Sequence, residues 1–451
     1  MLIVFFYYSL LILMKAGEIV KLFGTMKIDN EGVLEIGGMS VKDIKKEFGT
    51  PLYIIDEEFL RDTCRLFADN FKSENLKTEV IYASKAFLNI GMAKLINEEG
   101  LSMDVVSGGE LYTALKAGFP ADKIFMHGNN KTAEELELAI DNGVGTVVLD
   151  NRQEIKRLEN ILREKNSSMN VMLRVNPGIE AHTHEYIQTT KHDSKFGESI
   201  FTEDIYETAK YLDESDVLNF RGFHCHIGSQ IFEEESFIQA ALAMLDFVKD
   251  VKDNTGVETP DLNLGGGFGV YYTEEDEPMD LAAFLQKLTS EIENKIKEDG
   301  LWDMKILIEP GRSIISNAGT TLYEIGGTKE TYGGKDYVFI DGGMGDNPRP
   351  ALYQAKYEGY IANKMNEEPV HTYTVAGKCC ESGDIIIKDV KLPEAEIGDL
   401  FAVATTGAYT YSMASNYNRI PRPGVVFVQN GKGRVVVKRE TYEDIIKNDV
   451  L

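Results

Sequence analysis

Lys85 is a charged residue at the end of a strongly apolar stretch of the sequence. It lies near the end of the segment VIYASKA, in which Val80, Ile81 and Tyr82 predict a buried strand. A lysine at the mouth of a buried strand either extends its ammonium group to solvent or has a chemical role. One such role for a primary amine is a Schiff base with an aldehyde. The other strand-like segments help to decide between a solvent-exposed ammonium group and a chemical role.

Seven further apolar segments end in polar or small residues in the same way. They begin at residues 101, 124, 145, 171, 220, 262 and 305, with helical patterns such as TAEELELAIDNG between them. Eight strand–helix units over about 250 residues predict a (β/α)8 barrel, whose active sites form where the strands end. The residues expected at that face are Lys85, Asp104, Ser107, His127, Asn129, Arg174, Asn176, His224, His226, Ser229, Gly265, Gly266, Gly267, Gly269, Glu309, Gly311 and Arg312.

The glycine cluster LGGGFG indicates a phosphate site. Alone it could be a tight turn, and it is no dinucleotide fingerprint because no matching βαβ unit and acidic residue follow. However, the loops after strands seven and eight of this barrel often bind phosphate, and bare backbone N–H groups approach phosphate oxygens closely. Gly265–Gly267 and the Gly311-Arg312 pair fall in those two loops.

A lysine, a phosphate site and the acid Glu309 on one face predict pyridoxal 5′-phosphate. That cofactor needs a lysine for its Schiff base, an anchor for its phosphate and a partner for its pyridine nitrogen. A carboxylate beside that nitrogen favours the protonated ring, which is the stronger electron sink. His226 could lie flat against the ring, or it could be a buried histidine that is merely hydrogen-bonded.

The two HxH patterns allow a metal site as the alternative. His224 and His226 would face the same way on a strand and could bind zinc, and His182 and His184 have the same spacing. The barrel face offers no clear third and fourth ligand, and a metal would leave Lys85 without a role. We therefore expect no metal.

A second domain follows the barrel. After about residue 315, short segments such as YVFIDGG and GVVFVQN predict an antiparallel β-sandwich or barrel, and residues 26–55 look similar. We expect the β domain to comprise residues 26–58 and 316–451, and the barrel to comprise 59–315. The candidate functional residues of the β domain are Arg349, Tyr353, Cys380, Glu381, Tyr409 and Tyr417. Without further context these loops could be plain surface turns. Cys379 and Cys380 could be small buried residues that point to opposite faces of a strand.

Composition narrows the class of protein. The chain has 451 residues, is 43% apolar and has a net charge of −26, which argues against nucleic acid and anionic membranes as partners. Four cysteines form no disulfide framework, so we expect a reducing cytoplasm. The apolar run MLIVFFYYSLLILM is too short to span a bilayer, and no signal-peptide pattern surrounds it. Met14 and Met26 are alternative starts, and we expect residues 1–25 to lie outside the fold.

Taken together, the motifs resemble the diaminopimelate decarboxylase family of fold-type III pyridoxal-phosphate enzymes. The similarity runs from about residue 27 to 445, and the matching stretches are YASKAF, DVVSGGEL, HGNNK, RVNPG, DSKFG, GFHCHIGSQ, LNLGGGFG, IEPGRS, DNPRPALY, CESGD and GAYTYSMASNYN. One departure is Lys378-Cys379, where an apolar or proline pair is more usual, and the other is the N-terminal extension, which has no counterpart in the family.

The resemblance implies a role for each candidate. Lys85 would form the Schiff base, His226 would stack on the cofactor ring, and Glu309 would meet the pyridine nitrogen. The phosphate and its neighbourhood would be held by Ser229, Gly266, Gly267, Gly311, Arg312 and Tyr409. The substrate would be bound by Arg312, Arg349, Tyr353, Glu381 and Tyr409. Cys380 would be the proton donor.

The implied reaction is decarboxylation of meso-2,6-diaminopimelate to L-lysine and CO2, the last step of lysine biosynthesis by that route. The family is a head-to-tail homodimer in which Cys380 and Glu381 reach into the partner's site. Decarboxylases of arginine, ornithine or carboxynorspermidine are the rivals, and Arg349 with Glu381 favours diaminopimelate. A racemase would want a tyrosine where Cys380 lies, and a non-catalytic binding protein would usually lack Lys85 or Cys380.

Overall fold

The protein divides into a barrel unit and a β unit. The computed structural model describes residues 4–7, 10–15, 18–178, 194–301 and 303–450. The barrel unit comprises Thr63–Val270 and Glu277–Ser313, and the β unit comprises Met1–Asp62, Tyr271–Asp276 and Ile314–Leu451. The expected β domain lacked Tyr271–Asp276, which follow the glycine cluster.

The barrel predicted from the sequence is confirmed. Eight parallel strands pair in the order β11-β10-β9-β8-β16-β15-β14-β12, and β11 pairs with β12 to close the ring. The strands are β8 (Lys77–Ala83), β9 (Ser102–Val105), β10 (Ile124–Met126), β11 (Thr146–Leu149), β12 (Met169–Asn176), β14 (Leu218–His224), β15 (Asp261–Asn263) and β16 (Lys305–Ile308). β12 also pairs with the short β13 (Glu198–Ser199).

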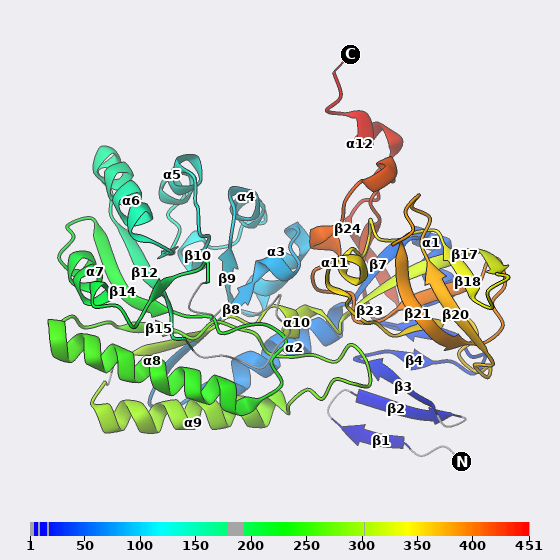
Figure 1. Ribbon diagram of the computed structural model, residues 1–451, viewed down its shortest axis with the longest axis horizontal. Helices are drawn as coiled ribbons and strands as arrows, with labels where there is room; N and C mark the ends of the chain where they lie inside the picture. The colour runs from blue at the N-terminus through cyan, green and yellow to red at the C-terminus, as the bar shows by residue number, and fades with distance from the viewer. Residues whose placement is uncertain (1–3, 8–9, 16–17, 179–193, 302, 451) are drawn as a thin grey trace. The chain divides into compact units, whose positions relative to one another are not determined.

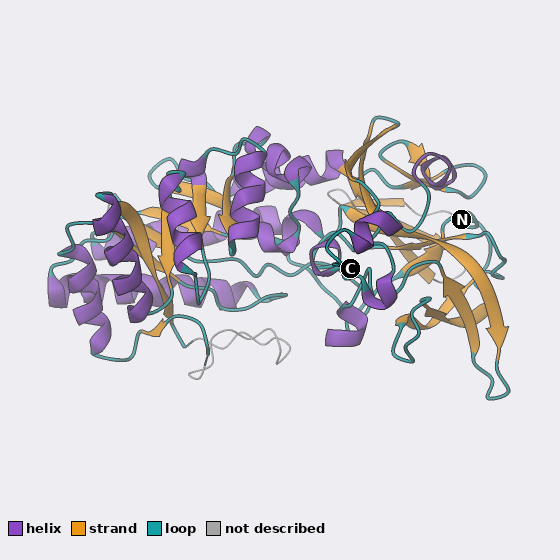
Figure 2. Ribbon diagram, turned by 90° about the horizontal axis from the view of Figure 1, so that it is seen from above, coloured by secondary structure: helices purple, strands orange, loops and turns teal. Residues whose placement is uncertain are grey.

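Helices cover the outside of the strands (Figures 1 and 2). They are α2 (Glu57–Asn70), α3 (Ile90–Glu98), α4 (Gly108–Lys116), α5 (Ala133–Asp141), α6 (Arg152–Lys165), α7 (Asp204–Asp213), α8 (Glu234–Thr255) and α9 (Leu281–Asp299). Inside the barrel, Ile81, Phe125, Val148, Met172 and Leu307 pack together with almost no exposed surface. This apolar layer closes the barrel interior, so polar chemistry is confined to the strand ends.

The β unit is a mixed sheet rather than the antiparallel one expected. Its order is β21-β20-β18-β17-β7-β23-β24, with β22 beside β17 and β19. The strands are β7 (Leu52–Asp56), β17 (Gly319–Glu330), β18 (Asp336–Ile340), β19 (Gly359–Ile361), β20 (His371–Ala376), β21 (Ile385–Leu392), β22 (Leu400–Val403), β23 (Gly424–Gln429) and β24 (Lys432–Val437). The pairs β7–β23 and β18–β20 are parallel, because β7 comes from the other end of the chain and β20 returns after a long connection.

Smaller elements complete the β unit. They are β4 (Lys27–Ile28), β5 (Leu34–Ile36), β6 (Met39–Ser40), α1 (Val41–Phe48), α11 (Arg349–Tyr353) and α12 (Tyr442–Ile446), while α10 (Arg312–Ile315) crosses the unit boundary.

The N-terminal segment forms a hairpin sheet of β1 (Val4–Tyr7), β2 (Leu10–Lys15) and β3 (Glu18–Phe23). Leu22 and Phe23 are buried in the core of the β unit. The expectation that all of residues 1–25 lie outside the fold is therefore wrong at its C-terminal end, since the apolar side chains at 22 and 23 pack in that core.

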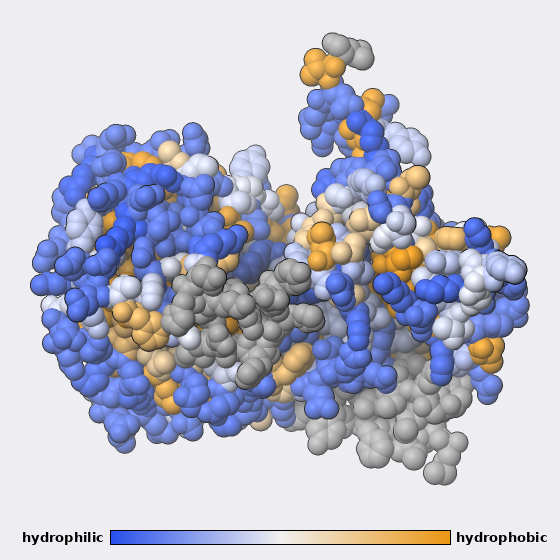
Figure 3. Space-filling model, viewed as in Figure 1, coloured by the Kyte–Doolittle hydropathy of each residue, from blue (hydrophilic) through white to orange (hydrophobic). Residues whose placement is uncertain are grey.

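The surface of the barrel unit is largely polar in the view of Figure 3. This agrees with the charged residues on the outer faces of its helices. None of the helices in the described ranges is long and apolar enough to cross a membrane.

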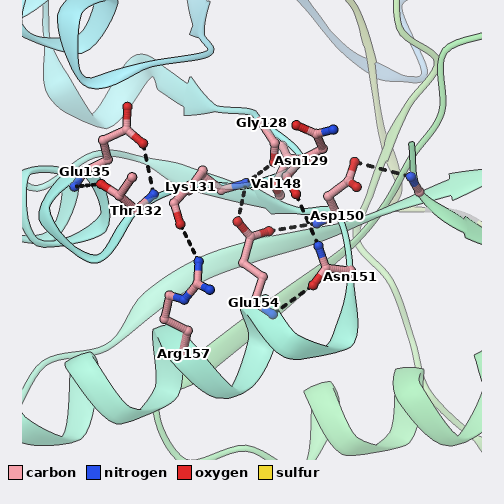
Figure 4. Close-up of polar contacts among 11 residues, drawn as sticks. Gly128, Asn129, Lys131, Thr132, Glu135, Val148, Asp150, Asn151, Glu154 and Arg157 are labelled. Carbon is pink, nitrogen blue, oxygen red and sulfur yellow. Dashed lines mark hydrogen bonds and ion pairs between the residues drawn. The ribbon is translucent and has the colours of Figure 1, made fainter. Parts of the chain in front are cut away.

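A buried ion pair ties two of the barrel loops together (Figure 4). Lys131 is 1% exposed, and its Nζ lies 2.7 Å from the carbonyls of Gly128 and Val148 and 2.9 Å from Oε1 of Glu154. The other oxygen of Glu154, in the first turn of α6, accepts the N–H of Asp150 at 2.9 Å. The ammonium group thereby joins the loop after β10 to the end of β11.

Lys131→Met should destabilise the fold strongly. Removing one partner of a buried ion pair leaves the other charge uncompensated, which costs about 3–5 kcal/mol. Urea unfolding would measure this loss, and Lys131→Met/Glu154→Leu should recover part of it. Lys72→Met, which removes an exposed pair with Asp69, is the control. Equal stability of Lys131→Met and Lys72→Met would contradict the prediction.

Candidate active site

Lys85 lies on a turn that is anchored on both sides. The turn (Ser84–Ala86) directly follows β8, and the Lys85 side chain is exposed while Ser84 and Ala86 are buried. The Ser84 N–H donates to Oδ1 of Asp104 at 2.7 Å, and the Tyr82 hydroxyl donates to the carbonyl of Phe87 at 2.7 Å. The amine is thus held at the mouth of the strand, as the sequence predicted.

Glu309 is the centre of a buried polar cluster after β16. Its Oε1 accepts the Asn263 amide at 2.7 Å and lies 2.9 Å from Nε2 of His127. Its Oε2 lies 3.1 Å from Nε2 of His224. The three partner side chains come from the ends of β10, β14 and β15, so three other strands converge on the carboxylate at the end of β16.

The electrostatics of this cluster keep Glu309 ionised. Burial lowers the pKa of His224 to about 4, so its imidazole is neutral at pH 7 and its Nε2–H can donate to the carboxylate. Burial alone would raise the pKa of Glu309, but the attraction and hydrogen bonds of His127 and His224 outweigh it and hold the pKa well below its usual range. An ionised carboxylate at this position is suited to pair with the protonated pyridine nitrogen of the expected cofactor.

Asp104, at the end of β9, is a second buried acid near Lys85. Burial raises its pKa to about 7, while the charges of His127 and Lys85 oppose that rise. Both its protonated and its ionised form therefore occur near neutral pH. The sequence placed Asp104 at this face but assigned it no role.

His226 is oriented by the glycine cluster. The Gly266 N–H donates to its Nδ1 at 3.3 Å, and burial lowers the pKa of the imidazole well below its ordinary value. The ring is therefore neutral, with its proton on Nε2. Lys85 and Glu309 both act electrostatically on it, which indicates that the structure brings these three predicted residues together.

The glycines are required by close packing of the strand ends. A Cβ on Gly266 would lie 2.0 Å from the carbonyl oxygen of Glu309, and one on Gly267 would lie 2.3 Å from that of Gly228. Gly267 also has a φ of +118°, which side chains rarely allow. A Cβ on Gly311 would lie 2.7 Å from Cβ of Ala83.

Ser229, in the loop after β14, contacts Arg312, in the loop after β16 that is predicted to bind phosphate. The Ser229 hydroxyl oxygen accepts Nε of Arg312 at 3.2 Å and Nη2 at 2.9 Å. Arg312 is only 8% exposed and opens α10. A hydroxyl and a guanidinium side by side are suited to an anion such as phosphate.

In the β unit, Arg349 is held by two tyrosines. Its Nη1 donates to the hydroxyls of Tyr272 at 3.0 Å and Tyr357 at 2.7 Å, and its guanidinium lies 5.0 Å from the centre of the Tyr272 ring. Tyr353 is one turn further along α11 and is 41% exposed. The pair presents a cation and a phenol from one short helix.

Cys380 and Glu381 lie in the turn between β20 and β21, and both are exposed. The expectation that Cys379 and Cys380 lie in a strand and face opposite sides is wrong, because the chain turns here. The Cys380 N–H donates to Oδ1 of Asn418 at 2.7 Å, and Oε1 of Glu381 accepts the Gly383 N–H at 3.1 Å.

Two other predicted tyrosines lie in the loops after β22. Tyr409 is half-buried and has a φ of +59°, which is unusual for a side chain of its size. Tyr417 is exposed.

The histidine pairs considered for a metal do not act as pairs. His224 contacts Glu309, whereas His226, beyond the end of β14, contacts Gly266. His127, His224 and Glu309 lie close enough to hold an ion, but they already contact one another directly. His182 and His184 lie outside the described residues.

Sequence reasoning missed Asn263, Tyr272 and Tyr357. Asn263 precedes the glycines in LNLGGGFG, so its place at a strand end could have indicated it. Nothing near Tyr272 or Tyr357 in the sequence indicates Arg349 as a partner.

Comparison with known proteins identifies the family of this chain. Residues 58–316 match the family model described as pyridoxal-dependent decarboxylase, pyridoxal binding domain. The chain is 49% identical to the diaminopimelate decarboxylase of Bacillus subtilis (strain 168), over 95% of this chain and 98% of that protein.

Solved structures agree with these sequence matches. The diaminopimelate decarboxylase of M. jannaschii in complex with L-lysine superposes with a TM-score of 0.87 at 32% identity, over 95% of this chain and 98% of that one. The Helicobacter pylori enzyme complexed with L-lysine gives 0.81 at 32% identity, over 90% and 98%. The chain therefore belongs to the pyridoxal-dependent decarboxylases and, among them, to the diaminopimelate decarboxylase family.

Proposed function

We propose that the enzyme decarboxylates meso-2,6-diaminopimelate to L-lysine and CO2, the last step of lysine biosynthesis by that route. The observation that carries the proposal is the 49% identity with a diaminopimelate decarboxylase over nearly the whole of both chains. Two of the solved relatives hold L-lysine, the expected product.

The barrel residues fit pyridoxal phosphate, the cofactor of this family. Lys85 is an accessible amine for the aldehyde, Glu309 is an ionised carboxylate for the ring nitrogen, and His226 is a neutral ring that can stack. The candidates for the phosphate are Ser229, Gly266, Gly267, Gly311 and Arg312 of the barrel unit and Tyr409 of the β unit. When bound, the cofactor supplies an electron sink for the pair left behind by CO2.

The β unit would select the substrate. Diaminopimelate has a carboxylate and an ammonium group at each end, and the reacting carboxylate must be free to leave. Arg349, Tyr353 and Tyr409 of this unit, together with Arg312 of the barrel unit, would hold the distal carboxylate through charge-assisted hydrogen bonds. Glu381 would pair with the distal ammonium group.

Cys380 would complete the reaction by supplying a proton. The bond between the α-carbon and its carboxylate breaks, CO2 leaves, and the α-carbon takes the proton of the thiol. The thiolate then regains a proton from water. The thiol is exposed on its turn, so it can approach a substrate.

The exposed turn also supports a homodimer with shared sites. We propose that Cys380 and Glu381 serve the site of a second copy, as the family resemblance implies. The enzyme would work in the cytoplasm, where the cysteines, all free in the described chain, stay reduced.

Decarboxylases of other basic amino acids are the second candidate function. A lysine/ornithine decarboxylase of Vibrio vulnificus has the same fold, with a TM-score of 0.71, but only 23% identity. Arg349 distinguishes the candidates, because a distal amine has no use for a guanidinium group.

A product assay tests the proposal. Purified protein with pyridoxal phosphate would be offered meso-diaminopimelate, ornithine, arginine and carboxynorspermidine separately, and amines and CO2 would be quantified. We expect L-lysine from diaminopimelate alone. Release of CO2 only from one of the other three would overturn the assignment of Arg349 and Glu381.

Lys85→Ala should lose covalent attachment of the cofactor, because the change removes the amine that we expect to form the Schiff base. Borohydride reduction followed by peptide mass spectrometry should place the cofactor on Lys85 in the wild type and nowhere in the variant. Lys94→Ala, on α3, is the control. Labelling at another lysine in the wild type would refute the assignment.

Cys380→Ala should keep the cofactor and lose turnover by roughly 10²–10⁴-fold, the range typical of a general acid. Cys64→Ala, which changes another free cysteine, on α2, is the control and should stay near wild-type rates. Cofactor absorbance and lysine release would be followed together. A Cys380→Ala enzyme that turned over like wild type would exclude the thiol as proton donor.

A further inference from the structure

Asp384 lies behind the Cys380 turn and touches two separate loops. Its carboxylate is almost completely buried, with 2% of the residue exposed. One oxygen, Oδ2, accepts the Cys379 N–H at 2.7 Å. The other, Oδ1, accepts the Met344 N–H at 2.7 Å. The loop at Met344 leads, five residues later, to Arg349.

The packing around this carboxylate leaves little room for another arrangement. A Cβ on Gly377 would lie 2.3 Å from Oδ2 of Asp384, and one on Gly343 would lie 2.5 Å from it. The Lys378 N–H also donates to the carbonyl of Gly342 at 2.9 Å. The segments that contain Gly343 and Gly377 therefore both pack against the Asp384 side chain.

We propose that Asp384 is a positioning residue, which fixes the turn that carries Cys380 and Glu381 against the loop that leads to Arg349. This inference rests on the proposed function, because it assumes that the Cys380 thiol gives a proton to the substrate. A carboxylate suits the task because it offers an acceptor to each loop, whereas an amide would direct its NH2 group at one of the two N–H donors.

The electrostatics agree with this arrangement. Burial raises the pKa of Asp384, and the N–H groups of Cys379 and Met344 pull it back toward the ionised form. The charge is therefore stabilised by the backbone groups that it holds, so loss of the charge should release both loops.

Hydrogen exchange tests the link without any substrate. In Asp384→Asn, amides in both 342–346 and 377–381 should exchange at least tenfold faster than in the wild-type holoenzyme. Asp56→Asn is the matched control, since Asp56 is equally buried in the same unit and also accepts two backbone N–H groups, from Thr25 and Phe59. Unchanged exchange in the 342–346 segment of Asp384→Asn would overturn the inference.

A kinetic cycle tests whether Asp384 acts through the thiol. Asp384→Asn should lower kcat about 10²-fold, the effect of a misplacement of about 1 Å. In the Cys380→Ala background the same change should lower kcat less than about threefold. Asp56→Asn should leave kcat unchanged.

Equal losses in both backgrounds would overturn the positioning role. If the wild type released no lysine from diaminopimelate, the proposed function would fail, while the exchange result would still decide whether Asp384 joins the two loops.

Discussion

The buried carboxylate of Glu309 is the charge on which the barrel's polar chemistry depends. An ionised group with 8% of its residue exposed survives only if the protein replaces the water that it loses. Asn263, His127 and His224 do so from three other strands. Because those strands are brought together only when the ring of eight closes, the site exists only in the complete barrel.

The same crowding explains why so many glycines stand at the strand ends. Gly266 approaches the carbonyl of Glu309 and also orients His226 through its N–H. One residue therefore packs against Glu309 and donates to His226, the acid and the histidine that we propose for the cofactor ring. The sequence interpretation of LGGGFG as a phosphate loop omits this second task, which follows from the distance between two backbones rather than from any ligand.

Much of the barrel could be predicted from the sequence because its signals are local. Each strand is marked by a short apolar run in the sequence. Lys85 and Glu309 can be recognised because they come within two positions of the ends of β8 and β16. The β unit was harder, since β7 pairs in parallel with β23, whose residues lie more than 370 positions away. Alternation of apolar residues predicts a strand but says nothing about which partner it takes or in which direction.

For the site, too, contacts between residues far apart in the sequence limit what could be predicted. Asn263 and Glu309 are 46 positions apart, and Arg349 meets Tyr272 across 77. Asp384 is a sharper case, because CESGD identifies its neighbours Cys380 and Glu381 by their chemistry, whereas its own role depends on Met344 in another loop. Residues that react can be recognised by type and order, but residues that hold them in place are recognised only by what they touch.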